Sequence, residues 1–174
     1  MRTRRPWATY SLTAGVASWT VMAFGGSVGL ASSPDGSAMG FDTAWLQDTP
    51  FSDYLLPGVI LGFLGVGGAA ATGLLVRGLR APGRRGRRQG APSAWQWYFA
   101  LIVVLGQFGW IAGEVVLMWT VVSTLPSDQR TFFYGFWWVF GVLSTANLLL
   151  AFAPSTRRIL GAAGAAGAAG PSLR

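Results

Sequence analysis

Four long apolar stretches constrain this chain more than any other feature of its sequence. They cover residues 10–31, 55–77, 96–122 and 133–153. A helix needs roughly 20 residues to cross a hydrocarbon core about 30 Å thick, and each stretch is that long. Charged residues make up only 11% of the chain, whereas soluble domains carry about 25%. The sequence therefore predicts an all-α fold, an integral membrane four-helix bundle spanning 10–153.

The charged residues indicate how this bundle is oriented. The loop at about 78–95 is rich in Arg, whereas the loop at about 32–54 carries four Asp. Short Arg-rich loops stay in the cytoplasm, so we expect both termini to be cytoplasmic. On this model 12 of the 13 Arg lie inside, and Arg130 is the exception. Residues 1–9 would then form a basic N-terminus and 154–174 a flexible Gly/Ala tail, in a multi-pass protein of the inner (plasma) membrane.

The first apolar stretch also has some features of a secretory signal, because basic residues precede it. Its run of about 20 apolar residues is longer than a typical signal core, so we expect an uncleaved helix. Cleavage near Ala31, Ser32 and Ser33 stays open as the alternative.

The amino-acid composition argues against several kinds of metal, cofactor and catalytic site. The chain has no Cys and no His, which removes the usual ligands of zinc, haem and iron–sulfur centres and the base of Ser-His-Asp triads. It has no Lys for a phosphate-binding loop. We therefore expect no enzyme activity, no metal and no cofactor. The net charge is +7, and the arginines that carry it flank apolar spans. This arrangement favours contact with the bilayer, and with anionic lipid at the Arg-rich loop, over contact with nucleic acid.

Packing and anchoring residues follow the same plan. Small residues four apart, at Gly25/Gly29, Gly58/Gly62, Ala69/Gly73 and Gly109/Gly113, predict close helix packing, within one chain rather than at a dimer seam. Aromatic residues at the predicted ends of the spans are expected to anchor at the headgroups; they are Trp7, Tyr10, Trp95, Trp97, Tyr98, Trp119, Tyr134, Trp137 and Trp138.

One polar group stands out inside the spans. Gln107 and Glu114 are seven residues apart on one face of the third span, with Trp110 between them. Polar groups in hydrocarbon are costly, so this face should point inward. Counting residues from the outer ends places Asn147 of the fourth span at the depth of Gln107, and we predict a hydrogen bond between the two amides.

Two interpretations of Glu114 stay open. A carboxyl group in a span can mark a proton or cation path, or it can fix helix packing through hydrogen bonds, and we favour the structural role. Ser27 of the first span and Arg130 of the outer loop are its expected neighbours.

The end of the first outer loop carries a second motif. Asp53 is expected to cap the second helix, Pro57 and Gly58 to lie in its first turn, and Tyr54, with Phe51, to settle at the interface. In this Pro-Phe-x-Asp-Tyr-x-x-Pro-Gly type of run, and in the Trp-Ile-x-x-Glu pattern at 110–114, the chain resembles a family of small uncharacterised four-span bacterial proteins of actinobacterial type. The high Arg, Gly and Ala content fits such a source. The resemblance implies the membrane fold and the interest of Asp53 and Glu114, but no activity.

Two functions stay open on these observations. The first is a non-enzymatic structural or accessory membrane subunit, packed against a larger membrane complex or against itself. The alternative is a small proton- or cation-linked transporter that uses Glu114.

Overall fold

The computed structural model describes residues 7–80 and 95–160, and these are helical apart from the turns and the first connecting loop. In order, the elements are α1 (Trp7–Ser32), η1 (Ser37–Met39), η2 (Thr43–Leu46), α2 (Leu55–Arg80), α3 (Trp95–Thr124), α4 (Ser127–Ala151) and α5 (Pro154–Leu160). The helices α1 to α4 are each long and apolar enough to cross a membrane. The predicted all-α, four-helix membrane bundle is confirmed; the side on which the termini lie stays a prediction.

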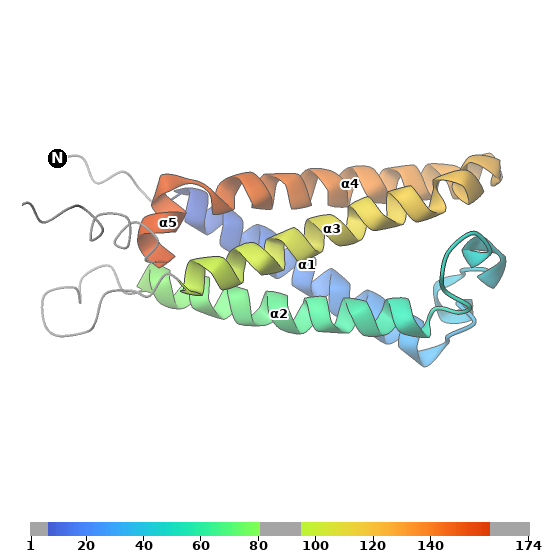
Figure 1. The fold of residues 1–174 in the computed structure, drawn as a ribbon, viewed down its shortest axis with the longest axis horizontal. Coiled ribbons are helices and arrows are strands. Elements are labelled where there is room, and N and C mark those ends of the chain that lie inside the picture. The colour runs from blue at the N-terminus through green and yellow to red at the C-terminus, as the bar shows by residue number, and fades with distance from the viewer. Residues whose placement is uncertain (1–6, 81–94, 161–174) are drawn as a thin grey trace, which may run out of the picture.

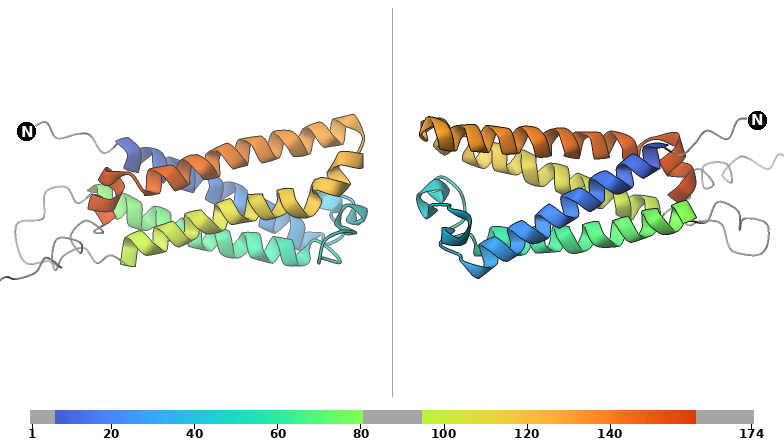
Figure 2. Two further views of the ribbon diagram at one scale, coloured as in Figure 1. Left: turned by 45° about the horizontal axis from the view of Figure 1, so that its top comes forward. Right: turned by 180° about the vertical axis from the view of Figure 1, so that it is seen from behind.

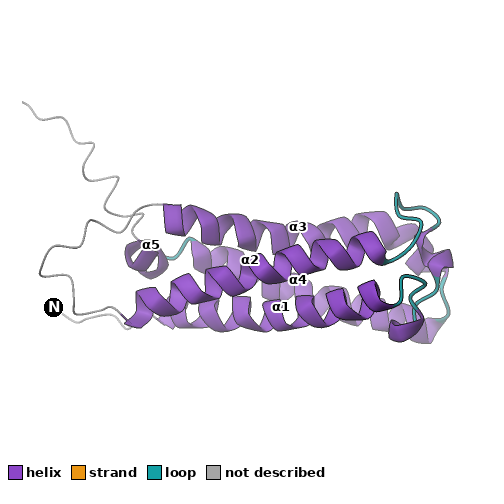
Figure 3. Cartoon of the chain, turned by 90° about the horizontal axis from the view of Figure 1, so that it is seen from below, coloured by secondary structure: helices purple, strands orange, loops and turns teal. Residues whose placement is uncertain are grey.

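The four long helices form two pairs that diverge along the bundle. α1 packs most extensively against α2, and α3 packs against α4. Figures 1 and 2 show the pairs close together where α5 lies and separated at the opposite end, where the loop with η1 and η2 lies between them. We call the α5 end the terminal end and the opposite end the loop end. The view from below in Figure 3 shows α5 lying across the terminal end.

The fourth long helix begins earlier than the sequence predicts. α4 starts at Ser127, not at 133, so that only Leu125 and Pro126 connect it to α3. Pro126 is the N-cap, with φ at −53°, and Asp128 lies in the first turn. Proline sets a helical φ, and a carboxylate in the first turn favours the positive end of the helix dipole. These local effects outweigh the polarity that suggested a loop.

The prediction of a flexible tail is also wrong for its first seven residues, which form α5. Thr156 and Leu160 of α5 are fully buried, and the Thr156 hydroxyl lies 3.4 Å from that of Thr9 in α1. Proline is well tolerated in a first helical turn, and Leu160 gives the short helix an apolar contact in the core. The predicted basic residues 1–6, the Arg-rich segment 81–94 and the tail from 161 onward lie outside the described residues.

Glycines of α2 allow α1 to approach closely. A Cβ at Gly58 would lie 3.0 Å from the Ala31 backbone nitrogen, and one at Gly62 would lie 2.9 Å from the Ser27 hydroxyl. The predicted packing role of this pair within the chain is therefore confirmed. The Gly109/Gly113 pair behaves differently, because a Cβ at either position would meet nothing within 4 Å.

The aromatic anchors divide into two groups. Most of the predicted anchors are exposed, as headgroup contact requires. Trp97 and Trp137 are instead buried, each only 7% exposed, so the anchoring prediction is wrong for both. The Trp97 indole donates a hydrogen bond to the Ala151 carbonyl at 3.0 Å, and the Arg157 guanidinium lies 4.9 Å above the Trp97 ring. Trp97 therefore fixes the turn between α4 and α5.

Candidate functional site

A cavity of about 690 Å³ lies in the loop-end half of the bundle, where the two helix pairs diverge. All four long helices and the first loop contribute to its walls, and its lining is mostly apolar. A volume of this size is in the range of small-molecule binding sites in proteins. The candidate site is therefore a space between helices that is partly open at the sides of the bundle.

Among the described residues that line this cavity, Glu114 has the only carboxylate. Its side chain is partly buried, and Trp110, one turn earlier on α3, lines the same cavity. Gly109 and Gly113 line the same wall, and the space above both is open. The small residues thus leave room directly beside the acid.

Aromatic rings form the α4 wall of the cavity. Phe132, Phe136 and Phe140 repeat every four residues and therefore lie on one face of α4. The rings of Phe136 and Phe140 have centroids 4.5 Å apart, and Trp19 of α1 meets Phe140 edge-on at 6.5 Å. This wall was missed at the sequence level, although the spacing of the phenylalanines could have revealed it.

The expected neighbours of Glu114 lie elsewhere. Arg130 directs its guanidinium to the Ser123 carbonyl, with Nη1 3.5 Å from the oxygen, because α4 begins early and places Arg130 on its first turn. Ser27 packs against Gly62 of α2 and does not line the cavity. Both predictions are therefore wrong.

The outer-loop motif fastens the loop to the bundle. The Asp53 carboxylate accepts a hydrogen bond from the Leu55 backbone N–H at 2.9 Å, as predicted for a residue that caps α2. Pro57 is buried and lines the cavity. Gly58 is buried against Leu30 of α1. Asp53 and Gly58 are thus structural, whereas Pro57 also forms part of the cavity wall.

Tyr54 is buried, with 4% exposure, so its predicted place at the interface is wrong. Its backbone N–H donates to the Pro34 carbonyl at 2.8 Å, and its hydroxyl donates to the Asp42 carbonyl at 2.8 Å. Burial, and then the nearby Asp42 charge, raise the pKa of Tyr54 to about 12. The backbone bond therefore joins the two ends of the first loop, and the neutral phenol, which lines the cavity, holds the middle of the loop at Asp42.

Gln107 and Asn147 are buried but do not form the predicted hydrogen bond. Neither amide atom of Gln107 has a partner among the described residues, and Nδ2 of Asn147 has none either. The Asn147 side chain lies against Gly15 of α1, and the Gln107 Nε2 lies near Gly68 of α2. Similar depth was not sufficient, because the two amides face different helices.

These amides belong to a wider polar layer below the cavity. The Trp19 indole N–H and the Ser144 hydroxyl are also buried without a partner among the described residues. Gln107 precedes Glu114 by two turns, or about 10.5 Å along α3. Trp19 also lines the cavity, whereas Asn147 lies against Gly15, between Leu12 and Val16 of the aliphatic core. We call Trp19, Gln107, Ser144 and Asn147 the polar layer.

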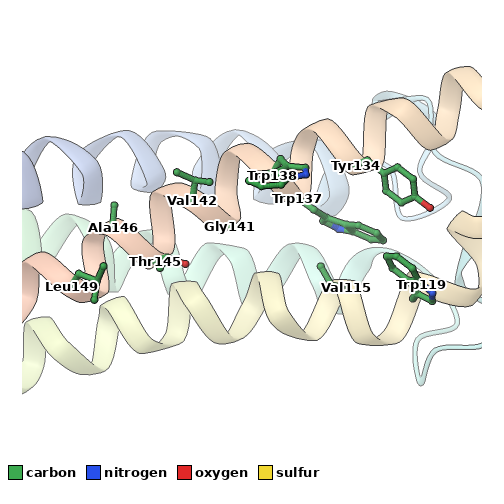
Figure 4. A pocket seen from close by; sticks show the side chains of 10 residues that line it. All are labelled: Val115, Trp119, Tyr134, Trp137, Trp138, Gly141, Val142, Thr145, Ala146 and Leu149. Carbon is green, nitrogen blue, oxygen red and sulfur yellow. The ribbon is translucent and has the colours of Figure 1, made fainter.

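A second hollow lies on the outside of the bundle, in the groove between α3 and α4. Figure 4 shows Trp119 from α3 and Tyr134 from α4 at one end of this groove and Leu149 at the other. Trp119 stacks on Tyr134, with ring centroids 6.0 Å apart. Along the groove, the space above Gly141 is open, and Thr145 is exposed. We call this surface the α3–α4 groove.

The structure thus gathers Glu114, Trp110, Tyr54 and Pro57 around one cavity and leaves Gln107 and Asn147 below it. Comparisons with protein-family models, curated proteins and solved structures gave no match to this chain.

Proposed function

We propose that the chain is a non-enzymatic accessory subunit of the inner (plasma) membrane, and that a transmembrane helix of a larger membrane protein occupies the α3–α4 groove. The groove itself is the observation that carries this proposal. Its wall combines the open space at Gly141 with the exposed Thr145 hydroxyl. The resemblance to small four-span actinobacterial-type proteins agrees with the fold and adds no activity.

A protein helix can offer this groove contacts that lipid tails cannot. In a bilayer, helices associate through close packing at small residues and through hydrogen bonds between helices. A helix seated over Gly141 would approach the α4 backbone closely, and it would offer the Thr145 hydroxyl a partner that lipid tails lack. The flanking rings of Trp119 and Tyr134 would add contact area.

Copurification tests this role most directly. The full chain, tagged and extracted from native membranes in mild detergent, should carry a stoichiometric membrane partner. Gly141→Leu fills the open space in the groove and should release that partner. Gly73→Leu is the matched control, since Gly73 also has open space around it but lies on α2, outside the groove, and it should retain the partner. Recovery of the chain alone would overturn the proposal, and recovery of a second copy alone would replace the larger partner by self-association.

The charge distribution supports the orientation with cytoplasmic termini. Arg77 and Arg80 lie in the last turn of α2, at the terminal end, and Arg157 and Arg158 lie in α5. In the described residues every Asp lies at the loop end: Asp35, Asp42, Asp48, Asp53 and Asp128. The arginines would also meet the anionic lipid of the inner leaflet, at about 1 kcal/mol each.

Cysteine labelling in intact cells tests this orientation cleanly, because the chain has no native Cys. A membrane-impermeant maleimide should label Ser37→Cys, in the exposed η1, and should not label Ser155→Cys, in α5, until the cells are opened. Labelling of Ser155→Cys alone would indicate the opposite orientation, with the termini outside.

A small proton- or cation-linked transporter is the second candidate, and the position of Glu114 in the cavity favours it. In proteoliposomes that hold a pH gradient, external cations should accelerate decay of the gradient, and Glu114→Gln should abolish that effect. The same acceleration in the variant would defeat the transporter proposal.

A further inference from the structure

The cavity holds a carboxylate that the described residues, 7–80 and 95–160, do not neutralise. No Arg lines the cavity, and the described residues form no ion pair with Glu114. Arg130, the one basic residue at the loop end of the described chain, is directed to the Ser123 carbonyl. A carboxylate in apolar surroundings is costly unless a positive partner or hydrogen bonds compensate it. A cationic guest would supply that partner.

The walls suit a cation with an apolar body. Trp110, one turn from Glu114 on α3, lines the cavity together with Trp19, Phe136 and Phe140. The faces of aromatic rings attract cations, and cages of such rings recognise quaternary ammonium groups. An apolar body would fill the remaining volume, in which aliphatic and aromatic side chains predominate.

The same walls argue against other guests. An anion would meet the Glu114 carboxylate with no Arg in the lining to bind it, and a phospholipid headgroup would bring its phosphate into the same place. A divalent metal ion requires several oxygen ligands, whereas no group of three or more acidic residues in the described part of the chain is arranged to hold one.

Access to the cavity is lateral. Met22 of α1, Phe132 of α4 and Leu117 of α3 line the cavity, yet they are 56%, 54% and 37% exposed at the sides of the bundle. In a bilayer these exposed faces meet lipid tails. A guest dissolved in the membrane can therefore reach the cavity without crossing the loop.

From these observations we propose that the loop-end cavity is a binding site for one lipophilic monovalent cation, held by the Glu114 carboxylate and enclosed by aromatic rings. This inference goes beyond the accessory role and names the ligand class for the second candidate. It concerns binding alone, so its failure would leave the copurification result untouched, and loss of the accessory role would leave it standing.

Equilibrium binding of radiolabelled tetraphenylphosphonium to the purified full chain, in dodecyl maltoside micelles, tests the site. Saturable binding of one cation per chain above the level of empty micelles is expected. Glu114→Gln preserves the shape of the side chain and should weaken binding at least tenfold. Asp48→Asn is the matched control, because it removes an exposed loop acid, and its affinity should equal that of the wild type.

Gly113→Leu provides an independent variant that leaves every charge in place. Its side chain would occupy the open space beside Glu114 and should abolish binding, whereas Gly73→Leu, at an open position away from the cavity, should not. Since the two cavity variants act through charge and through volume, a folding failure of one leaves the other decisive.

Four results would overturn the proposal. The first is the absence of saturable binding by the wild type. The second is undiminished affinity in folded Glu114→Gln or Gly113→Leu protein. The third is equal saturable binding of tetraphenylborate, an anion of matched shape, and the fourth is displacement of the cation by small amounts of phosphatidylethanolamine, which would assign the cavity to a lipid.

Discussion

The same four helices pack differently in the two halves of the bundle. In the terminal half, aliphatic side chains such as Leu12, Leu75 and Val104 are fully buried in one cluster, which α5 completes with Leu160. In the loop-end half, the helix pairs diverge, and aromatic rings line a cavity of about 690 Å³. The bundle is therefore closely packed at the terminal end and encloses a cavity at the loop end.

The join between the halves should give the largest effect. A Cβ at Gly68 would overlap the Thr20 hydroxyl and lie 3.4 Å from Gln107 Nε2. Gly68→Leu is therefore expected to destabilise the fold by about 3 kcal/mol, the upper end of overpacking costs. Gly113→Leu, in the loop-end half that encloses the cavity, should reduce the stability only slightly. Thermal unfolding in detergent measures both, and equal losses of stability would remove the contrast.

Truncations within the two halves should differ next. Leu75 is fully buried, whereas Leu117 of the cavity wall is 37% exposed. We expect Leu75→Ala to cost about 2 kcal/mol, the low end for such substitutions, because in lipid mainly lost packing contributes. Leu117→Ala should cost well under half of that in the same unfolding measurement. A larger loss for Leu117→Ala would mean that the cavity is tightly packed in solution.

The closure of the terminal half depends on one indole. Trp97→Phe removes the hydrogen bond to the Ala151 carbonyl and weakens the contact with Arg157. We expect a loss of about 1.5 kcal/mol, confined to α5. Hydrogen exchange should therefore increase in residues 154–160 and stay unchanged in the first loop. Increased exchange in that loop would show that the halves are coupled.

The smallest effect concerns the loop that covers the cavity. The raised pKa of Tyr54 means that the folded protein keeps the phenol neutral up to about pH 12, whereas the unfolded chain ionises near pH 10. Stability is therefore complete below about pH 10 and falls between pH 10 and 12. Tyr54→Phe should remove that alkaline loss and cost about 1 kcal/mol at neutral pH, through the hydrogen bond to Asp42. Persistence of the alkaline loss in the variant would assign it to another group.

The sequence predicted the four helices better than the cavity between them. Span length and charge are local properties, and they were sufficient to identify the four helices and the Asp53 cap of α2, but not the start of α4 after Pro126. Seven-residue spacing placed Gln107 and Glu114 on one face of α3, but the partners of that face depend on how the helices cross. Asn147 accordingly faces Gly15 of α1, although its depth suggested Gln107.

The cavity itself depends on how the helices pair, which the Gly58/Gly62 spacing alone does not determine. Gly58 and Gly62 draw α2 onto α1, and the early start of α4 after Pro126 keeps that helix beside α3. The separation of the two pairs follows from both. The four-residue spacing of Phe132, Phe136 and Phe140 could have indicated a common aromatic face, but not the space in front of it.

Cysteine reactivity along α3 tests the contrast between the halves most directly. Gly113→Cys would place a thiol in the cavity, whereas Val104→Cys would place one in the fully buried core. We predict that N-ethylmaleimide modifies position 113 quickly in the folded protein and position 104 only after unfolding. Equal rates at the two positions, or faster modification of position 104, would contradict the account.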